Sequence, residues 1–246
     1  GTPRHERSRR RLNTPPSVKL LLFDIDGTLV LTGGAGARAM ASAFEDVFGV
    51  RQGLSGIPMA GRTDAWILSQ AATTHQIPCD EARAQSFRES YLKKLAVEVH
   101  EPGPRKGIMP GVCALLDQLS DRDDVYLALL TGNLEGGARV KLEYFDLWRY
   151  FRCGAFGDQL HDRNDLLKVA LERVTTSGGP VKPSEVIVIG DTPLDVAVAK
   201  RGGARSLAVA TGGYDAATLQ ASGADVVLES FSDVMAALTA LGLSPR

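Results

Sequence analysis

Cysteine is scarce in this sequence, and long hydrophobic runs are missing from it. The 246 residues include three cysteines, Cys79, Cys113 and Cys153, and no C-x-x-C pair brings two of them together. This spacing argues against a disulfide framework and against a zinc site, so we expect a protein of the reducing cytoplasm. No apolar stretch approaches the roughly 20 residues that cross a bilayer, and we therefore expect no membrane partner.

The sequence also has no excess of either charge. Its 28 basic and 29 acidic residues leave a net charge of −1, whereas nucleic-acid binding usually needs a basic surface. We therefore expect no nucleic acid as a partner. Arginine is concentrated in residues 1–17, which hold few apolar residues, and we expect a flexible, solvated tail there. A nucleic-acid or membrane tether is the alternative interpretation of this tail.

The hydrophobic pattern alternates between strands and helices over most of the chain. The predicted strands are residues 18–23, 125–130, a short one near 151–157, 185–190, 206–210 and 225–228. Such alternation predicts an α/β fold with a doubly wound parallel sheet. Residues 34–106 instead carry three helical patterns and end in the Pro/Gly-rich HEPGPRKG. We therefore predict a core of residues 18–33 and 107–246 and a small all-helical domain over 34–106.

Residues 18–30, VKLLLFDIDGTLV, are the stretch around which the rest is organised. The apolar run predicts a strand buried on both faces of a parallel sheet, and it ends in Asp24 and Asp26. Open α/β sheets bind their ligands at the carboxyl ends of the strands. The two carboxylates point to the same side, so Asp24 can attack an electrophile while Asp26 donates or accepts a proton. The turn at Gly27 can offer backbone N–H groups to an anion.

A second predicted strand ends in small polar residues. VYLALLTGN presents Thr131, Gly132 and Asn133 at the start of the next predicted helix. The threonine hydroxyl and the two backbone N–H groups suit an anion of phosphate size. An ordinary helix N-cap is the alternative interpretation of these three residues.

A third predicted strand ends in carboxylates. EVIVIGDTPLD presents Asp191 and, one helical turn later, Asp195. Residues four apart lie on one face of a helix. Together with Asp24, they can hold a hard cation through oxygen, as Mg²⁺ prefers.

The strings D-I-D-G-T, T-G-N and G-D-T-P-L-D together resemble the first, second and fourth motifs of the haloacid dehalogenase-like hydrolase superfamily. The second aspartate of the first motif is similar to that of the phosphatases, because the dehalogenases lack it, and phosphoglycolate phosphatase-like members look most similar. The resemblance spans about residues 18–242. It implies a Rossmann-like core with a helical cap inserted between the first and second motifs.

The third motif of the superfamily is where this sequence departs from the pattern. The resemblance implies a lysine, or less often an arginine, before the helix that precedes the fourth motif. Arg163 occupies that place, and a guanidinium can grip phosphate through two N–H groups. Lys168 is the alternative, although it lies inside the helical pattern. The string Gly61-Arg62-Thr63 resembles the substrate-facing loop of such caps, so Arg62 is either a substrate ligand or an exposed surface residue.

The resemblance implies a Mg²⁺-dependent phosphatase that acts on a small-molecule phosphate monoester through an aspartyl-phosphate. Asp24 is then the nucleophile, and Asp26 is the acid and base. The implied metal ligands are Asp24, the backbone carbonyl of Asp26, Asp191 and Asp195. The predicted substrate-binding residues are Gly27, Thr131, Gly132, Asn133, Arg163 and Arg62. A sugar phosphomutase of the same superfamily and a phosphate-ligand-binding protein without turnover stay open as alternatives. The sequence decides neither the phosphate ester nor between a monomer and a homodimer.

Overall fold

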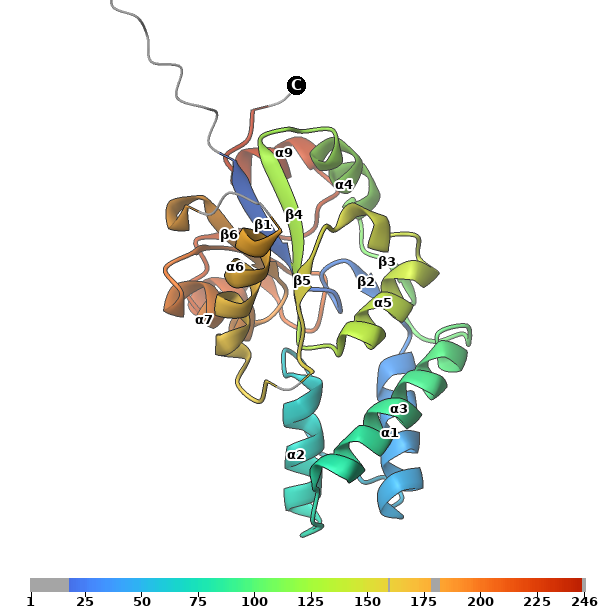
Figure 1. Cartoon of the computed structure of the whole chain (residues 1–246). Helices are drawn as coiled ribbons and strands as arrows, with labels where there is room; N and C mark the ends of the chain where they lie inside the picture. The colour runs from blue at the N-terminus through green and yellow to red at the C-terminus, as the bar shows by residue number, and fades with distance from the viewer. Residues whose placement is uncertain (1–17, 159, 178–181, 245–246) are drawn as a thin grey trace, which may run out of the picture.

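The centre of the molecule is a six-stranded parallel sheet (Figure 1). The computed structural model describes residues 18–158, 160–177 and 182–244, so the predicted tail over 1–17 lies outside the described residues. The sheet consists of β1 (Lys19–Phe23), β4 (Val125–Leu130), β5 (Gly154–Ala155), β6 (Val186–Gly190), β7 (Arg205–Val209) and β8 (Val226–Leu228). The strand order is β5-β4-β1-β6-β7-β8. The predicted α/β fold with a doubly wound parallel sheet is confirmed.

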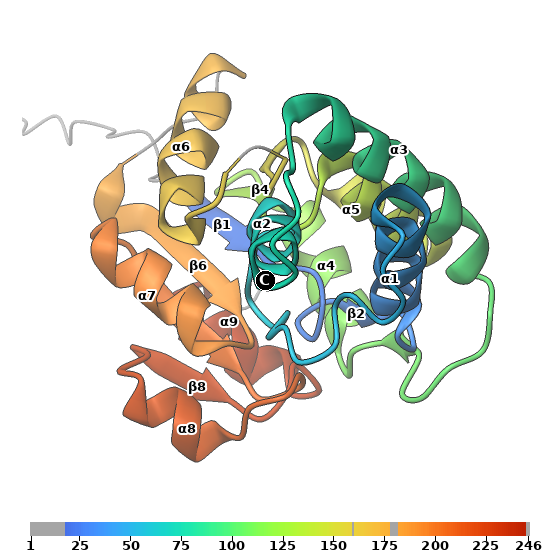
Figure 2. The same cartoon turned by 90° about the horizontal axis from the view of Figure 1, so that it is seen from below.

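Helices cover both faces of this sheet (Figures 1 and 2). The helices of the core are α4 (Val112–Ser120), α5 (Glu135–Tyr144), α6 (Leu166–Thr176), α7 (Pro193–Arg201), α8 (Ala216–Ala221) and α9 (Val234–Ala240). Short 3₁₀ helices lie at η1 (Trp148–Tyr150), η2 (Arg163–Asp165) and η3 (Pro183–Glu185). On one face α4, α5 and α9 pack together, and on the other lie α6 and α7.

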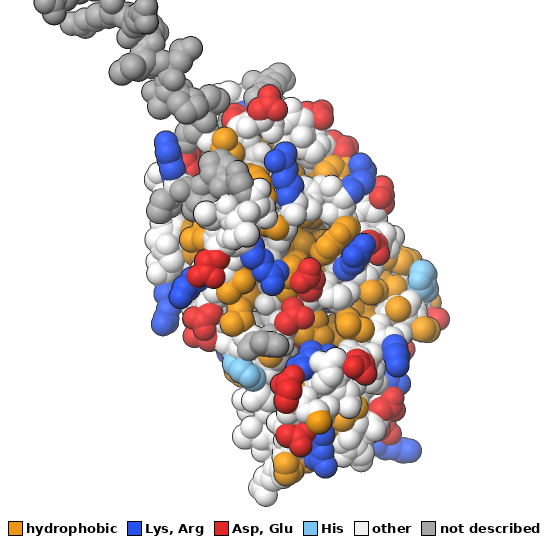
Figure 3. Space-filling view, in the orientation of Figure 1, with side chains coloured by type: hydrophobic (Ala, Val, Ile, Leu, Met, Phe, Trp, Pro, Cys, Tyr) orange, Lys and Arg blue, Asp and Glu red, His pale blue; other side chains and the backbone are white. Residues whose placement is uncertain are grey.

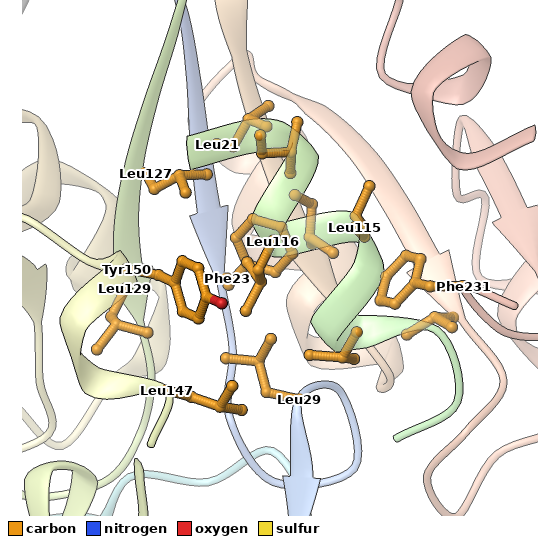
Figure 4. Close-up of a cluster of buried hydrophobic side chains, with 14 of the residues drawn as sticks. Leu21, Phe23, Leu29, Leu115, Leu116, Leu127, Leu129, Leu147, Tyr150 and Phe231 are labelled. Atoms are coloured by element: carbon orange, nitrogen blue, oxygen red, sulfur yellow. The ribbon is translucent and has the colours of Figure 1, made fainter. Parts of the chain in front are cut away.

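The side chains of β1 alternate between two hydrophobic clusters, which explains why its sequence is apolar throughout. Leu21 and Phe23 belong to the cluster of α4 and α9, and Figure 4 shows them beside Leu115 and Leu116. Leu20 and Leu22 belong to the cluster of α6 and α7. Burying each such side chain contributes about 1.5–3 kcal/mol to folding. This burial fixes the carboxyl end of β1 at the middle of the sheet.

Three helices form a separate group at the end of the sheet (Figure 1). They are α1 (Ala35–Phe48), α2 (Asp64–Thr74) and α3 (Glu81–Glu98). Phe44, Phe87 and Tyr91 are buried between them. Thr63 caps α2 and Asp80 caps α3 through their side-chain oxygens. We call residues 34–106 the helical segment; its standing as a domain with these bounds remains a proposal.

The helical segment is attached through a pair of short strands that the sequence did not predict. β2 (Val30–Leu31) pairs antiparallel with β3 (Gly107–Ile108). Two residues are too few to show the alternation that marks a strand. The predicted strand near 151–157 is likewise reduced to the two residues of β5. The pairing of β2 with β3 brings the chain back to the core close to where it left.

The surface carries both signs of charge. Figure 3 shows lysine, arginine, aspartate and glutamate side chains intermixed on one face of the molecule. Within the described ranges, no helix is both long enough and apolar enough to cross a membrane. The expected cytoplasmic location and the expected lack of a nucleic-acid partner stay predictions.

Candidate active site

The loop after β1 presents two aspartates on one side of the chain. The amide of Asp24 donates to the carbonyl of Ile189 at 2.9 Å, which continues the pairing of β1 with β6. Asp24 is buried, Ile25 points into the hydrophobic core, and Asp26 is partly exposed. Gly27 has a φ of +81°, and a Cβ there would lie 2.3 Å from Asp191 Oδ2. Glycine is therefore required at the turn, because any side chain would displace Asp191.

Arg163 lies deep in the same place. Its Nη2 group lies 2.9 Å from Asp24 Oδ2 and also donates to Asp195 Oδ1. Its Nη1 group donates to the carbonyl of Gly61 at 3.1 Å. Lys168, the alternative candidate for the cation of the third motif, is exposed on α6. The structure thus places Arg163, rather than Lys168, beside the predicted nucleophile.

Three buried carboxylates gather around this arginine. Oxygen atoms of Asp24, Asp191 and Asp195 lie within 4.8 Å of one another. Burial, with smaller effects of Asp195 and Asp26 and against the pull of Arg163, raises the pKa of Asp24 to about 6. Burial and the neighbouring carboxylates also raise the pKa of Asp191. This excess of negative charge fits a divalent cation, and an all-oxygen donor set suits Mg²⁺.

The carboxylates differ in their other contacts. Asp191 Oδ1 accepts from the Thr28 hydroxyl at 3.2 Å. Asp195 Oδ2 accepts from the amide and hydroxyl of Thr192 at 3.0 and 2.7 Å, as part of a capping box at the start of α7. Both oxygens of Asp195 are engaged by side chains, Oδ1 by Arg163 and Oδ2 by Thr192. Among the described residues, side chains engage one oxygen each of Asp24 and Asp191, namely Asp24 Oδ2 and Asp191 Oδ1. Asp24 and Asp191 are the better candidates for direct contact with a metal.

The loop after β4 brings its polar residues to the same edge of the sheet. Thr131 is fully buried, and its hydroxyl accepts from the Asn133 amide and side chain at 3.3 and 2.8 Å. The Asn133 side chain also donates to Asp26 Oδ2 at 2.8 Å. Gly132 allows close approach, because a Cβ there would lie 2.1 Å from the carbonyl of Arg62. Thr131 and Asn133 are thus brought next to Asp26, and their predicted roles toward substrate stay predictions.

Lys141 is a site residue that the sequence did not predict. Its ammonium lies 2.8 Å from both oxygens of Asp26 and 2.7 Å from Asn133 Oδ1. Its side chain is only 6% exposed. The sequence does carry an indication of this role, because Lys141 falls on the same face of its helix as the buried residues Ala138 and Leu142. Charged residues on such a face are almost never fully buried unless they are paired.

The loop that leads into α2 closes over these residues. Gly61 contacts Arg163, and the Asp64 amide donates to the carbonyl of Gly132 at 2.8 Å. Arg62 is exposed, with its guanidinium 4.5 Å from the centre of the Trp66 ring. It lines a cavity of about 410 Å³ together with the aspartates, Thr131, Asn133, Lys141 and Arg163. On the side of the helical segment, Met40, Met59 and Ile67 give the cavity an apolar wall.

Asp64 joins the helical segment to the core. Its Oδ2 accepts from the amide of Leu134 at 2.9 Å. Burial raises the pKa of Asp64 from 3.8 to about 7; Lys141 opposes this shift, and Asp26 and Asp158 add to it. The folded protein therefore holds this proton to a higher pH than the unfolded chain does. The contribution of this group to stability is complete below 3.8 and is lost as the pH rises through about 7.

An Asp64→Asn variant is expected to gain thermal stability relative to the wild type as the pH rises from 5 to 8, because the amide keeps an acceptor for Leu134 but carries no buried charge. The measurement is the melting temperature of both chains at several pH values. Asp158→Asn is the comparison variant: Asp158 is half-buried and accepts from the Glu135 amide at 3.0 Å. Because Asp158 makes the smallest of these contributions to the pKa of Asp64, this variant should show little of the pH dependence. A constant difference between Asp64→Asn and wild type across this range would contradict the assignment.

Comparison with known proteins finds relatives that match most of this chain. A probable phosphatase, IndB, from Dickeya dadantii is 26% identical over 90% of this chain and 94% of its own length. A phosphoglycolate phosphatase from Rhodospirillum rubrum is 27% identical over 88% of this chain and 89% of its own length. Both similarities extend over the core and the helical segment.

Solved structures share the fold. A predicted phosphatase from Clostridium acetobutylicum superimposes with a TM-score of 0.69 at 20% identity, covering 91% of this chain and 99% of that one. CbbY from Rhodobacter sphaeroides, solved in complex with phosphate, gives 0.67 at 20% identity over 88% and 96%. The profile of the haloacid dehalogenase-like hydrolases matches residues 21–209. This chain belongs to the haloacid dehalogenase-like hydrolase family.

Proposed function

We propose that this chain is a Mg²⁺-dependent phosphatase that hydrolyses a small phosphate monoester through an aspartyl-phosphate on Asp24. The observation that carries the proposal is the convergence of Asp24, Asp26, Thr131, Arg163 and Asp191 on one cavity at the carboxyl ends of β1, β4 and β6. The relative from Rhodospirillum rubrum is a phosphoglycolate phosphatase. Phosphoglycolate is therefore the first natural substrate to test.

In the first step, a carboxylate oxygen of Asp24 attacks phosphorus. The new bond to Asp24 forms as the bond from phosphorus to the leaving oxygen breaks, and the electron pair stays on that oxygen. Asp26 gives its proton to the leaving oxygen. Asp26 suits this role because its side chain is 41% exposed, whereas that of Asp24 is 7% exposed.

In the second step, Asp26 takes a proton from a water molecule as that water attacks the phosphorus. The bond to Asp24 breaks and its carboxylate is restored, so that inorganic phosphate leaves and Asp26 is protonated again. One aspartate thus acts as acid and then as base, which requires a fixed position on the side of the leaving group.

The remaining residues hold the phosphoryl group. We assign the Thr131 hydroxyl, the backbone of Gly27, Gly132 and Asn133, and Arg163 to its oxygens. Asp24, the Asp26 carbonyl and Asp191 would hold Mg²⁺, with Asp195 supporting them through Arg163. When bound, the cation neutralises charge on the phosphoryl oxygens.

We also propose that the helical segment acts as a cap that excludes water and selects the leaving group. Its loop over residues 59–64 contributes Gly61 and Arg62 to the cavity and contacts the core at Gly132. Arg62 faces the leaving group in this assignment. The apolar wall formed by the segment suits the carbon skeleton of a small ester.

Purified protein should release phosphate from para-nitrophenyl phosphate and from phosphoglycolate in the presence of Mg²⁺, and excess EDTA should abolish the release. Re-addition of Mg²⁺ should restore it, because the carboxylate cluster needs a cation to accept a dianionic phosphoryl group. The measurement is free phosphate over time, with a panel of sugar phosphates assayed in parallel.

Each alternative predicts a different product. A sugar phosphomutase would accumulate an isomerised sugar phosphate with little free phosphate. A binding protein without turnover would bind the esters but release nothing. Phosphate release that continues unchanged in excess EDTA would contradict the metal-dependent mechanism.

A further inference from the structure

We propose that Lys141 is a positioning residue for Asp26, holding the carboxylate in place and favouring the release of its proton to the leaving group. This inference rests on the proposed function, in which Asp26 protonates the leaving oxygen. The residue stands on α5, ten positions after Thr131, and reaches Asp26 across the sheet edge.

The contacts of Lys141 show why a role in packing alone is a poor explanation. An ammonium has three hydrogen-bond donors, and here they match three acceptors: both oxygens of Asp26 and the side-chain oxygen of Asn133. Burying a lysine is costly unless it is paired in this way. An apolar residue at this place in the stripe of α5 would avoid that cost.

Lys141 lies at the wall of the cavity and is less exposed there than Asp26. The lysine side chain is 6% exposed and the aspartate side chain 41% exposed, so the carboxylate is the more accessible group of the pair. Across from it, a Cβ on Gly36 of α1 would lie 3.3 Å from the ammonium nitrogen. The absence of a side chain at Gly36 therefore leaves room for the lysine under the helical segment.

The same network ties Asp26 to the predicted phosphate site. The Asn133 amide group donates to both Asp26 Oδ2 and the Thr131 hydroxyl, each at 2.8 Å, while its carbonyl accepts from Lys141. Hydrogen bonds thus join Lys141, Asn133 and Asp26 to one another, and Asn133 extends this network to the Thr131 hydroxyl. This arrangement fixes the distance between the proton donor and the phosphoryl group.

The charge of Lys141 favours the proton transfer to the leaving oxygen in the first step. As the bond from phosphorus to the leaving oxygen breaks, the Asp26 proton moves to that oxygen, and the electron pair of the broken bond stays there. Asp26 becomes a carboxylate beside the ammonium, which stabilises the charge that develops on it. Lys141 keeps its own proton throughout. The effect should be large when the leaving group needs a proton and small when it leaves as a stable anion.

Two esters separate these cases. In a Lys141→Met variant, we expect kcat for phosphoglycolate, whose leaving alkoxide needs a proton, to fall by about 100-fold. For para-nitrophenyl phosphate, whose leaving group departs as an anion, we expect a loss of less than about fivefold. KM should change little for either ester. Lys168→Met, on the exposed face of α6, is the matched control and should resemble the wild type.

A double-mutant cycle tests whether Lys141 acts through Asp26. In an Asp26→Asn background, Lys141→Met should cause no further loss, because the proton donor is already absent. Lys141→Gln, which keeps a donor without the charge, should show the same preference for para-nitrophenyl phosphate and serves if Lys141→Met does not fold.

Equal losses for both esters, or an independent loss in the Asp26→Asn background, would overturn this inference while leaving the proposed function intact. Failure of the wild-type chain to hydrolyse either ester would instead overturn the proposed function, and the role of Lys141 with it.

Discussion

Asp24→Asn is expected to lower the rate of phosphate release by about 10⁴-fold or more, because an amide oxygen cannot form the aspartyl-phosphate. The substitution keeps the size of the side chain and its place at the end of β1. It also removes one charge from three buried carboxylates. The measurement is phosphate release from phosphoglycolate and para-nitrophenyl phosphate at saturating Mg²⁺.

The fold of this variant should be preserved. Since burial raises the pKa of Asp24 to about 6, loss of its charge should leave the melting temperature in EDTA at neutral pH unchanged or increased. Asp24→Ala is a second variant that cannot revert to aspartate by deamidation. Turnover within tenfold of the wild type in both variants would refute Asp24 as the nucleophile.

Arg163→Met is expected to lower both stability and activity. The Arg163 side chain is 5% exposed and pairs with Asp24 at 2.9 Å and with Asp195. Removal of one partner from a buried ion pair costs about 3–5 kcal/mol, because the remaining charges lose their compensation. For a chain of this length, that loss lowers the melting temperature by roughly 10 °C. Loss of phosphate contacts should also reduce kcat/KM by about 100-fold or more.

Further variants identify the cause of this loss. Arg163→Lys keeps the charge but not the two-pronged geometry, and it should recover part of the stability. Asp195→Asn combined with Arg163→Met should be more stable than Arg163→Met alone, because it removes one uncompensated carboxylate. Lys168→Met is the surface control. A melting temperature of Arg163→Met equal to that of the wild type would show that the ion pairs contribute nothing to folding.

The parallel sheet could be predicted from the sequence because its strands are buried on both faces. The runs before Asp24, Thr131 and Asp191 are apolar, and in the structure they form β1, β4 and β6. The membership in the haloacid dehalogenase-like hydrolases, expected from the motifs at these strand ends, is confirmed. The pairing of β2 with β3 could not be predicted, since it depends on where a distant segment returns to the core.

Site residues that directly follow strands could be predicted from the sequence, whereas site residues that lie on helices could not. The edge of a parallel sheet brings Asp24, Thr131 and Asp191 together wherever the intervening chain goes. Lys141 and Asp64 depend instead on the rotation of α5 and α2, which tertiary packing decides. Arg163 lies between these cases, because its place before a helix was evident but its contacts with two aspartates were not.

The formation of an aspartyl-phosphate on Asp24 is the central claim, and direct trapping tests it best. Wild-type protein mixed with para-nitrophenyl phosphate and Mg²⁺ would be quenched in acid within the first turnover, digested, and examined by mass spectrometry. We expect one phosphoryl group on the peptide that contains Asp24, and none on that peptide from Asp24→Asn. Full turnover with no phosphoryl group on that peptide, or with the group on another residue, would contradict the account.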